Sequence, residues 1–274
     1  MTAVAALGLL AAIPAAMWAE PSGSAPRDGD AAAVRRGMVA VLLDETNRAR
    51  ASARRSGLTL SRDLCVAAQA HAEDMLARGY FSHDSPEGES SAQRVERLAP
   101  RAIVLSVREN IQKSEGHEDD APHVRASEIV DGWMDSPGHR RNLLADDVTE
   151  VGFGVASRMV KGRLVEVAVQ VLGRIVGTWA EPPARTLRPP ERLRARLSVR
   201  VDFFLEDTAH PHRRYKDPAN ASISWVGGVP LVVVADGGAS IVEVPRVDPG
   251  RYRLLGRLTR EDGYQAIRDI RVVS

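Results

Sequence analysis

A chain of 274 residues is longer than one hydrophobic core usually supports, and a prior of roughly 150 residues per domain predicts two domains. Hydrophobic residues make up 44% and charged residues 27% of the chain, which excludes an intrinsically disordered protein. The formal net charge of +1 provides no strong basic field, so we do not expect nucleic acid as a partner. Cys65 is the single cysteine, which excludes an intramolecular disulfide.

The N-terminal segment favours export. Residues 1–19 carry no charged side chain, are rich in Ala and Leu, and end in small residues before Glu20, a pattern typical of a cleaved signal peptide. The segment lacks the usual basic start and approaches the ~20 residues that span a bilayer, so an uncleaved membrane anchor is the alternative. Either case predicts a secreted or cell-envelope protein, and export without disulfides indicates a bacterial source. Residues 20–37 are predicted to form a flexible spacer.

Helical periodicity marks the start of the first folded domain. Apolar residues recur at helical spacing over 38–55, with Gly57 as the expected C-cap. A second amphipathic helix is predicted between Ser61 as N-cap and Gly79 as C-cap. Its apolar face contains Leu64, Ala67, Ala68, His71, Met75 and Leu76.

Helices and strands then alternate as far as residue 176, which predicts a layered domain over residues 38–176. The expected elements are a short helix over 91–98, a β-rich run over 102–107, a helix over 124–134 that Ser136-Pro137-Gly138 stops before His139, and two strands over 151–156 and 164–172 joined at Lys161-Gly162.

The remaining chain is predicted to be a separate β domain. Residues 177–191 contain four prolines and no periodic pattern, so they are expected to form a semi-rigid linker. Over 192–274, short β-rich runs are separated by turn signals such as Asp236-Gly237-Gly238. Six or seven strands, the first over 197–205 and another over 221–225, predict a small β-sandwich of immunoglobulin-like type.

Three motifs in the first domain carry polar residues at separate positions, and an apolar fourth motif follows them. They are Tyr80-Phe81-Ser82-His83, then Glu109-Asn110-Ile111 preceded by Arg108, then the run from Trp133 through Ser136 and His139 to Leu143, and finally Val151-Gly152-Phe153-Gly154-Val155. In this order and at these distances the motifs resemble those of a CAP domain (SCP-like, pathogenesis-related-1-like), of the bacterial branch, and the resemblance covers about residues 39–176.

The resemblance implies an α-β-α sandwich, so that the whole chain would be an α+β protein with an all-β C-terminal domain. It also implies a central cavity with two histidines and acidic partners, which bind a divalent cation in some members. By motif, His83 and His139 correspond to the histidines and Glu109 to the glutamate.

Two positions depart from the family pattern. Arg108 stands where the family usually has a glycine and is expected to narrow or recharge the cavity entrance. Ser136 stands where many eukaryotic members have a second glutamate, so one carboxylate ligand is missing, although serine is common in the bacterial branch. The expected cavity residues are therefore His83, Glu109, Ser136 and His139.

Several functions are compatible with these residues. Two imidazoles and a carboxylate can fill three positions of a tetrahedral Zn²⁺ shell, so His83 and His139 are candidate metal ligands. A metal-dependent hydrolase with Glu109 as general base, a buried structural hydrogen-bond network and a cell-surface adhesion protein are the alternatives. The leading expectation is a non-catalytic binding module for a small apolar ligand, a lipid or a cell-wall fragment. A membrane contact is expected only through an uncleaved segment 1–19.

Other residues are predicted to have structural roles. We expect His71 and Trp133 to line the core or the cavity wall, Asn142 to tie a loop, Cys65 to be an inert buried thiol, and residues 115–120 to form a solvated acidic loop. The sequence contains no Gly-x-Ser-x-Gly element, phosphate-binding loop or His-Glu-x-x-His helix, so familiar hydrolase and nucleotide-binding classes are excluded.

Overall fold

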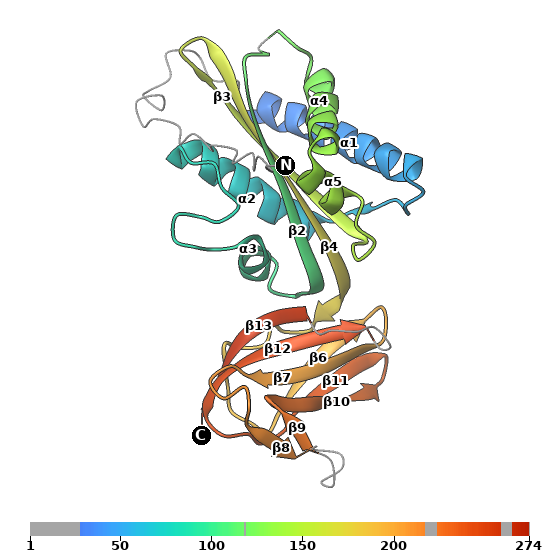
Figure 1. The fold of residues 1–274 in the computed structure, drawn as a ribbon, viewed down its shortest axis with the longest axis vertical. Coiled ribbons are helices and arrows are strands. Elements are labelled where there is room, and N and C mark those ends of the chain that lie inside the picture. The colour runs from blue at the N-terminus through green and yellow to red at the C-terminus, as the bar shows by residue number, and fades with distance from the viewer. Residues whose placement is uncertain (1–27, 118, 217–223, 259–264, 274) are drawn as a thin grey trace, which may run out of the picture.

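The computed structural model describes residues 28–117, 119–216, 224–258 and 265–273, which form two domains stacked end to end (Figure 1). The predicted signal peptide or anchor and residues 221–223 of a predicted strand lie outside the described residues. No helix in the described part of the chain is long and apolar enough to cross a membrane.

The first domain has a sheet between two helical layers (Figure 1). Its strands pair in the order β1-β3-β4-β2. One face carries α1, α4 and α5, and the other carries α2 and α3. The helices are α1 (Asp28–Ser52), α2 (Arg62–Arg78), α3 (Ser91–Leu98), α4 (Pro122–Asp135) and α5 (Pro137–Leu143), and the strands are β1 (Thr59–Leu60), β2 (Ala102–Glu115), β3 (Glu150–Val160) and β4 (Arg163–Trp179).

The central strand β4 supplies both hydrophobic cores of this domain. Val167, Val169 and Val171 pack on the side of α2 and α3, whereas Ala168 and Leu172 pack on the side of α1 and α4. Side chains of a strand alternate between faces, so a strand covered on both sides is apolar at nearly every position. The implied α-β-α sandwich is confirmed.

Local capping fixes the helices around the site. Ser61 is the N-cap of α2, and its hydroxyl accepts a hydrogen bond from the backbone N–H of Leu64, while Gly79 ends the helix in the left-handed conformation at φ 71°. Ser90 and Gln93 form a capping box at the start of α3. These helices begin and end as the sequence predicts.

The helix α2 packs unusually close to β3. A Cβ atom at Gly152 would lie 2.1 Å from the backbone of Leu64, and one at Gly154 would lie 2.3 Å from the backbone of Ala68. No side chain fits at such distances, so the two glycines allow direct contact between helix and strand. This contact fixes α2, and with it His71, over the sheet.

Three predicted boundaries in the first domain need correction. The helix α1 begins at Asp28, so residues 28–37 are helical rather than a spacer; the Gly- and Asp-containing composition gave a false loop signal in a segment that also contains three consecutive alanines. It ends at Ser52, before a turn in which Arg54 has φ 59°, so Gly57 is not its C-cap. His139 lies within the short helix α5 and not in a loop.

The second domain is all β and encloses one core. Its strands pair along a continuous path, β6-β11-β10-β7-β12-β13-β5, and β8 pairs with β9. The strands are β5 (Thr186–Leu187), β6 (Glu191–Leu197), β7 (Val201–Asp207), β8 (Arg214–Lys216), β9 (Ser224–Val226), β10 (Gly228–Asp236), β11 (Ala239–Val244), β12 (Gly250–Leu258) and β13 (Gln265–Val272). The strand predicted over 197–205 is the end of β6 followed by β7.

The strand β10 joins the two halves of this domain. Residues 228–231 pair with β7 and residues 232–236 pair with β11. An immunoglobulin-like sandwich has two separate sheets, whereas here one strand takes part in both. The two halves pack over a shared core that includes Phe203, Leu205 and Leu254.

The domain junction is rigid rather than a linker. The strand β4 runs on to Trp179, and residues 177–179 pair with residues 195–197 of β6. Trp179 and Leu187, both in the expected linker, are buried in the core of the second domain, together with Leu105 of β2. The proline count gave the linker signal, but buried apolar side chains and strand pairing fix this segment in place.

Candidate functional site

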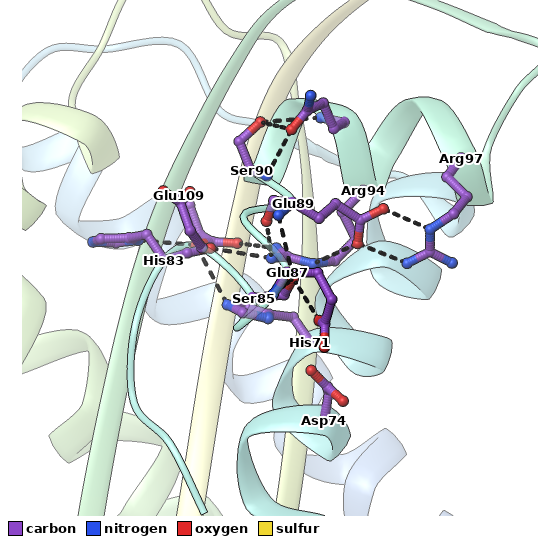
Figure 2. Close-up of polar contacts among 12 residues, drawn as sticks. His71, Asp74, His83, Ser85, Glu87, Glu89, Ser90, Arg94, Arg97 and Glu109 are labelled. Carbon is purple, nitrogen blue, oxygen red and sulfur yellow. Dashed lines mark hydrogen bonds and ion pairs between the residues drawn. The ribbon is translucent and has the colours of Figure 1, made fainter. Parts of the chain in front are cut away.

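Glu109 is the centre of a buried cluster of charged and polar groups (Figure 2). It lies on β2 with its side chain 3% exposed. Its Oε1 is 2.9 Å from Nδ1 of His83, and its Oε2 accepts a hydrogen bond of 3.0 Å from Nη1 of Arg94. Because an ionised carboxylate only accepts, His83 carries its proton on Nδ1 in this contact. Both carboxylate oxygens are therefore engaged.

Arg94 ties the site loop to α3. Its guanidinium is 3% exposed, and its Nη2 donates to the backbone carbonyls of His83 at 3.1 Å and Glu89 at 3.2 Å. The same side chain thus neutralises Glu109 and holds the loop that carries His83. The sequence prediction missed Arg94, since nothing in the local pattern of an amphipathic helix distinguishes it from a solvated arginine.

His71 lies beneath Glu109 and completes the cluster (Figure 2). It is fully buried on α2, with Nε2 at 2.9 Å from the carbonyl of Ser82 and at 3.8 Å from Glu109 Oε1. Tyr80 approaches its Nδ1 at 3.5 Å and donates to Asp74. Burial lowers the pKa of His71, and the nearby charge of Glu109 only partly offsets it. The predicted position in the core or cavity wall is confirmed.

A second hydrogen-bond network lies on the opposite face of β2. Asn110 is fully buried and donates to the carbonyl of His139 at 3.1 Å and to Gln170 Oε1 at 2.8 Å. Asn142 donates to Asn110 Oδ1 and to the carbonyl of Glu109, both at 3.0 Å. Gln170 in turn donates to Thr46 of α1 at 3.1 Å. This network holds α5, which carries His139, against the edge strand.

The two motif histidines have different protonation tendencies. The side chain of His83 is 54% exposed, and the hydrogen bond to Glu109 raises its pKa. His139 is half-buried, and burial lowers its pKa, with a further decrease from the positive charge of His83. His83 therefore favours the cationic form and His139 the neutral form.

Residues 43–171 match the model of the CAP family, described as the cysteine-rich secretory protein family. The first domain is a CAP domain. Two relatives from Bacillus subtilis match it: "Uncharacterized membrane protein YlbC" is 32% identical over 114 residues, which are 42% of this chain and 30% of the relative, and "Uncharacterized protein YkwD" is 28% identical over 113 residues, 41% and 40%. The matched region thus spans less than half the length of either relative.

One similar solved structure is that of an extracellular protein containing an SCP domain from Bacillus anthracis. It has 25% sequence identity and a TM-score of 0.44, with coverage of 56% of this chain and 45% of that protein.

The CAP domain brings only part of the predicted site into direct contact. His83 and Glu109 are bonded, while His139 is held nearby through its backbone. Ser136 is half-buried at the N-cap of α5 and makes no side-chain capping bond. Among the described residues, the one group of three possible metal donors within 4.8 Å of one another is His117, Asp120 and Glu128, so the three expected donors do not converge.

Of the other CAP residues, Asn142 and Trp133 have their predicted structural roles, whereas Cys65, predicted to be buried, is half-buried. Asn142 ties α5 to β2, and Trp133 is fully buried in the core with α1 and α4. Burial raises the pKa of the Cys65 thiol, partly offset by a hydrogen bond from the backbone N–H of Phe153. A raised pKa keeps the thiol protonated and unreactive.

Proposed function

We propose that the chain is an exported, non-catalytic binding protein whose CAP domain holds its ligand between His83 and His139 at the edge of β2. The pairing of Glu109 carries this proposal. Its two oxygens bond His83 and Arg94, so the carboxylate positions a histidine instead of facing a substrate. In this proposal the buried polar cluster around Glu109 supports the loop of His83, and the rings of His83 and His139 contact the ligand.

The same pairing argues against Glu109 as a general base. A base must reach the proton that it abstracts, directly or through one water. A proton on Glu109 would also remove the hydrogen-bonded counter-ion of Arg94, which is 3% exposed and otherwise has only Glu89 at 3.8 Å, and breaking a buried ion pair costs about 3–5 kcal/mol. Hydrolysis through Glu109 is therefore disfavoured.

The ligand class follows from the two rings and their surroundings. The pKa of His83 is raised, which favours an exposed cationic donor, the pKa of His139 is lowered, which favours a neutral ring, and the half-buried Tyr80 and Phe81 precede His83 in the same loop. A small, largely apolar molecule with one acceptor group, such as a lipid or a cell-wall fragment, suits this combination. The uncharged segment 1–19 supports a location outside the cytoplasm or in the cell envelope.

A divalent cation such as Zn²⁺ is the second candidate for this site. A carboxylate that bonds Nδ1 of a histidine leaves Nε2 for a metal, which is a common outer-shell arrangement. Here Glu109 orients His83 in this way, and His139 would be the second ligand. Two imidazoles fill half of a tetrahedral shell, and Ser136 replaces a carboxylate, so such a cation would complete its shell with the bound ligand or water.

Calorimetry tests both candidates. Zn²⁺ is titrated into the full chain and into His83→Ala/His139→Ala, with His123→Ala/His212→Ala as a control that removes two exposed histidines elsewhere. Equal heats from all three proteins would rule out the cation. Palmitic acid and a peptidoglycan digest are then titrated in the same way.

The binding function predicts heat that the site variant loses and the control keeps. Mass spectrometry of the recovered digest should show unchanged fragments. Cleavage that is lost in Glu109→Gln would overturn the non-catalytic assignment.

A further inference from the structure

A surface depression of about 720 Å³ lies beside α5, on the face of β2 opposite to the Glu109 carboxylate. Arg108 reaches it because successive strand residues point to opposite faces, so Arg108 and Glu109 diverge. Its polar lining consists of Arg55, Arg108, Arg140, Arg141, Asp146 and Asp147. We call this surface feature the arginine depression.

The two carboxylates of the arginine depression are already paired. Asp147 accepts two hydrogen bonds from Arg108, at 2.9 Å from Nε and 2.8 Å from Nη2, and Asp146 is paired with Arg55. Burial opposes the charge of Asp147, but the bonds from Arg108 and Ser106 together outweigh it and lower its pKa. Both carboxylates therefore already have an arginine partner.

Arg140 and Arg141 have no such partners. Both are exposed on α5 and line the arginine depression, and neither has a hydrogen bond or ion pair from its side chain to any part of the chain that the structure describes. Two guanidinium groups on adjacent residues, beside aspartates that other arginines already pair, make this rim positive.

A buried arginine adds to this charge from below. Arg50 is 2% exposed, and its guanidinium donates to the carbonyls of Ser56 at 2.8 Å, Leu143 at 2.7 Å and Ala145 at 3.0 Å. These acceptors are neutral, so they satisfy its hydrogen bonds without cancelling its charge. Its hydrogen bond to Ala145, a residue of the lining, places it directly beneath the depression.

The excess of positive charge therefore favours an anionic ligand. Five guanidinium groups stand against two carboxylates, a net charge of +3 in one small region, whereas the whole chain carries +1. The low dielectric constant of the protein wall strengthens the electric field of these charges in the depression. Guanidinium forks match carboxylates and phosphates, because they can donate two parallel hydrogen bonds.

The size and lining of the depression narrow the ligand further. A volume of about 720 Å³ exceeds what one small oxyanion fills, and Pro137, Leu144 and Ala145 provide apolar surface between the charges. The lining contains no aromatic residue, on which sugar rings or bases usually stack. An extended peptide with acidic side chains fits this combination of features.

We propose that the arginine depression is a binding site for acidic peptides, with Arg140 and Arg141 as the residues that contact the ligand carboxylates. Arg108 and Arg55 remain bonded to the aspartates and shape the wall, and Arg50 supplies the field beneath. The proposal does not depend on ligand binding at His83 and His139.

Fluorescence anisotropy with fluorescein-labelled hexaglutamate tests the proposal on the full chain. Arg140→Ala/Arg141→Ala should raise the Kd at least about tenfold, because the variant removes the charge-assisted hydrogen bonds to the ligand carboxylates. The matched control is Arg36→Ala/Arg62→Ala, which removes two exposed arginines on α1 and α2 and changes the net charge equally. The control should change the Kd less than twofold.

Each remaining outcome has a defined meaning. Absence of hexaglutamate binding, equal loss in both double variants, or equal binding of hexaglutamine would overturn the proposal. Inorganic phosphate that displaces the peptide at equal or lower concentration would show a small-oxyanion site instead. His83→Ala/His139→Ala should bind hexaglutamate like the wild type, which separates this site from the one in the proposed function.

Discussion

The two faces of β2 carry charged groups in opposite states. On one face, Glu109 is enclosed by Arg94, His83 and His71, and each charge has a partner at hydrogen-bond distance or nearby. On the other face, the arginine depression contains two unpaired arginines at its rim. Paired buried charges hold a fold together but have little capacity left for a ligand, whereas unpaired exposed charges contribute little to stability and remain available.

The largest effect is expected when the paired cluster loses its centre. Glu109→Ala removes the partner of His83 and the hydrogen-bonded carboxylate of buried Arg94, which keeps only Glu89 at 3.8 Å. The free energy of unfolding should therefore fall by about 3–5 kcal/mol in urea titrations followed by circular dichroism. The control Glu73→Ala removes an exposed glutamate that pairs with Arg35 and should cost at most about 1 kcal/mol. Similar losses in both variants would contradict the contrast between the two faces.

A smaller loss is expected from the neutral network behind His139. Asn110→Ala removes hydrogen bonds with His139, Gln170 and Asn142 at a fully buried position, and the partners left without hydrogen bonds should lower the free energy of unfolding by about 2–3 kcal/mol. The ring of His139 should shift in NMR spectra, since α5 loses an anchor.

A double-mutant cycle with Asn142→Ala checks the network directly. Because Asn110 and Asn142 share a hydrogen bond, the two losses should not add. Additive losses would show that the two side chains act independently.

The fold of the CAP domain was predictable wherever the signals were local. Ser61 and Gly79 mark the ends of α2, and Lys161-Gly162 marks the β3–β4 turn, because a cap or a tight turn depends on neighbouring residues. The junction was not predictable in this way. Trp179 and Leu187 are fixed by strands that follow them in the sequence, so a proline-rich composition alone gave a linker.

The site residues were predictable from the sequence motifs, but most of the contacts between their side chains were not. His83, Glu109 and His139 follow from the motif order, and His83 does contact Glu109. Arg94 could not be assigned, because its role arises only when α3 is folded over β2. Arg108 was noted as a departure at the cavity entrance, but its bond to Asp147 turns it to the opposite face.

The pH dependence of stability should also differ between the buried and exposed histidines. Burial lowers the pKa of His71 in the folded state, so the unfolded state binds its proton more readily. Its contribution is full above the ordinary histidine value of about 6.5 and is lost as pH falls toward the lower folded pKa. His83 has the opposite sign: its raised folded pKa stabilises the protein below about 6.5, and this is lost as pH rises through the folded value.

Unfolding in urea at several pH values between 5 and 8 separates the two contributions. As pH falls from 8 to 5, the free energy of unfolding of His71→Gln should decrease less steeply than that of the wild type. As pH rises over the same range, the free energy of unfolding of His83→Ala should decrease less than that of the wild type. Unchanged pH profiles in both variants would show that Glu109 does not couple to either ring.

The smallest effect on stability is expected in the arginine depression. Arg140→Ala/Arg141→Ala removes exposed side chains that make no ion pair with the described residues, so the free energy of unfolding should change by no more than about 0.5 kcal/mol. Any change should be stabilising at low salt, because the variant relieves repulsion with Arg50 and Arg55. Added salt screens that repulsion, so the difference between variant and wild type should shrink as ionic strength rises, measured by thermal unfolding. A clear destabilisation would mean that these arginines are structural, like Arg94, and are not free to bind a ligand.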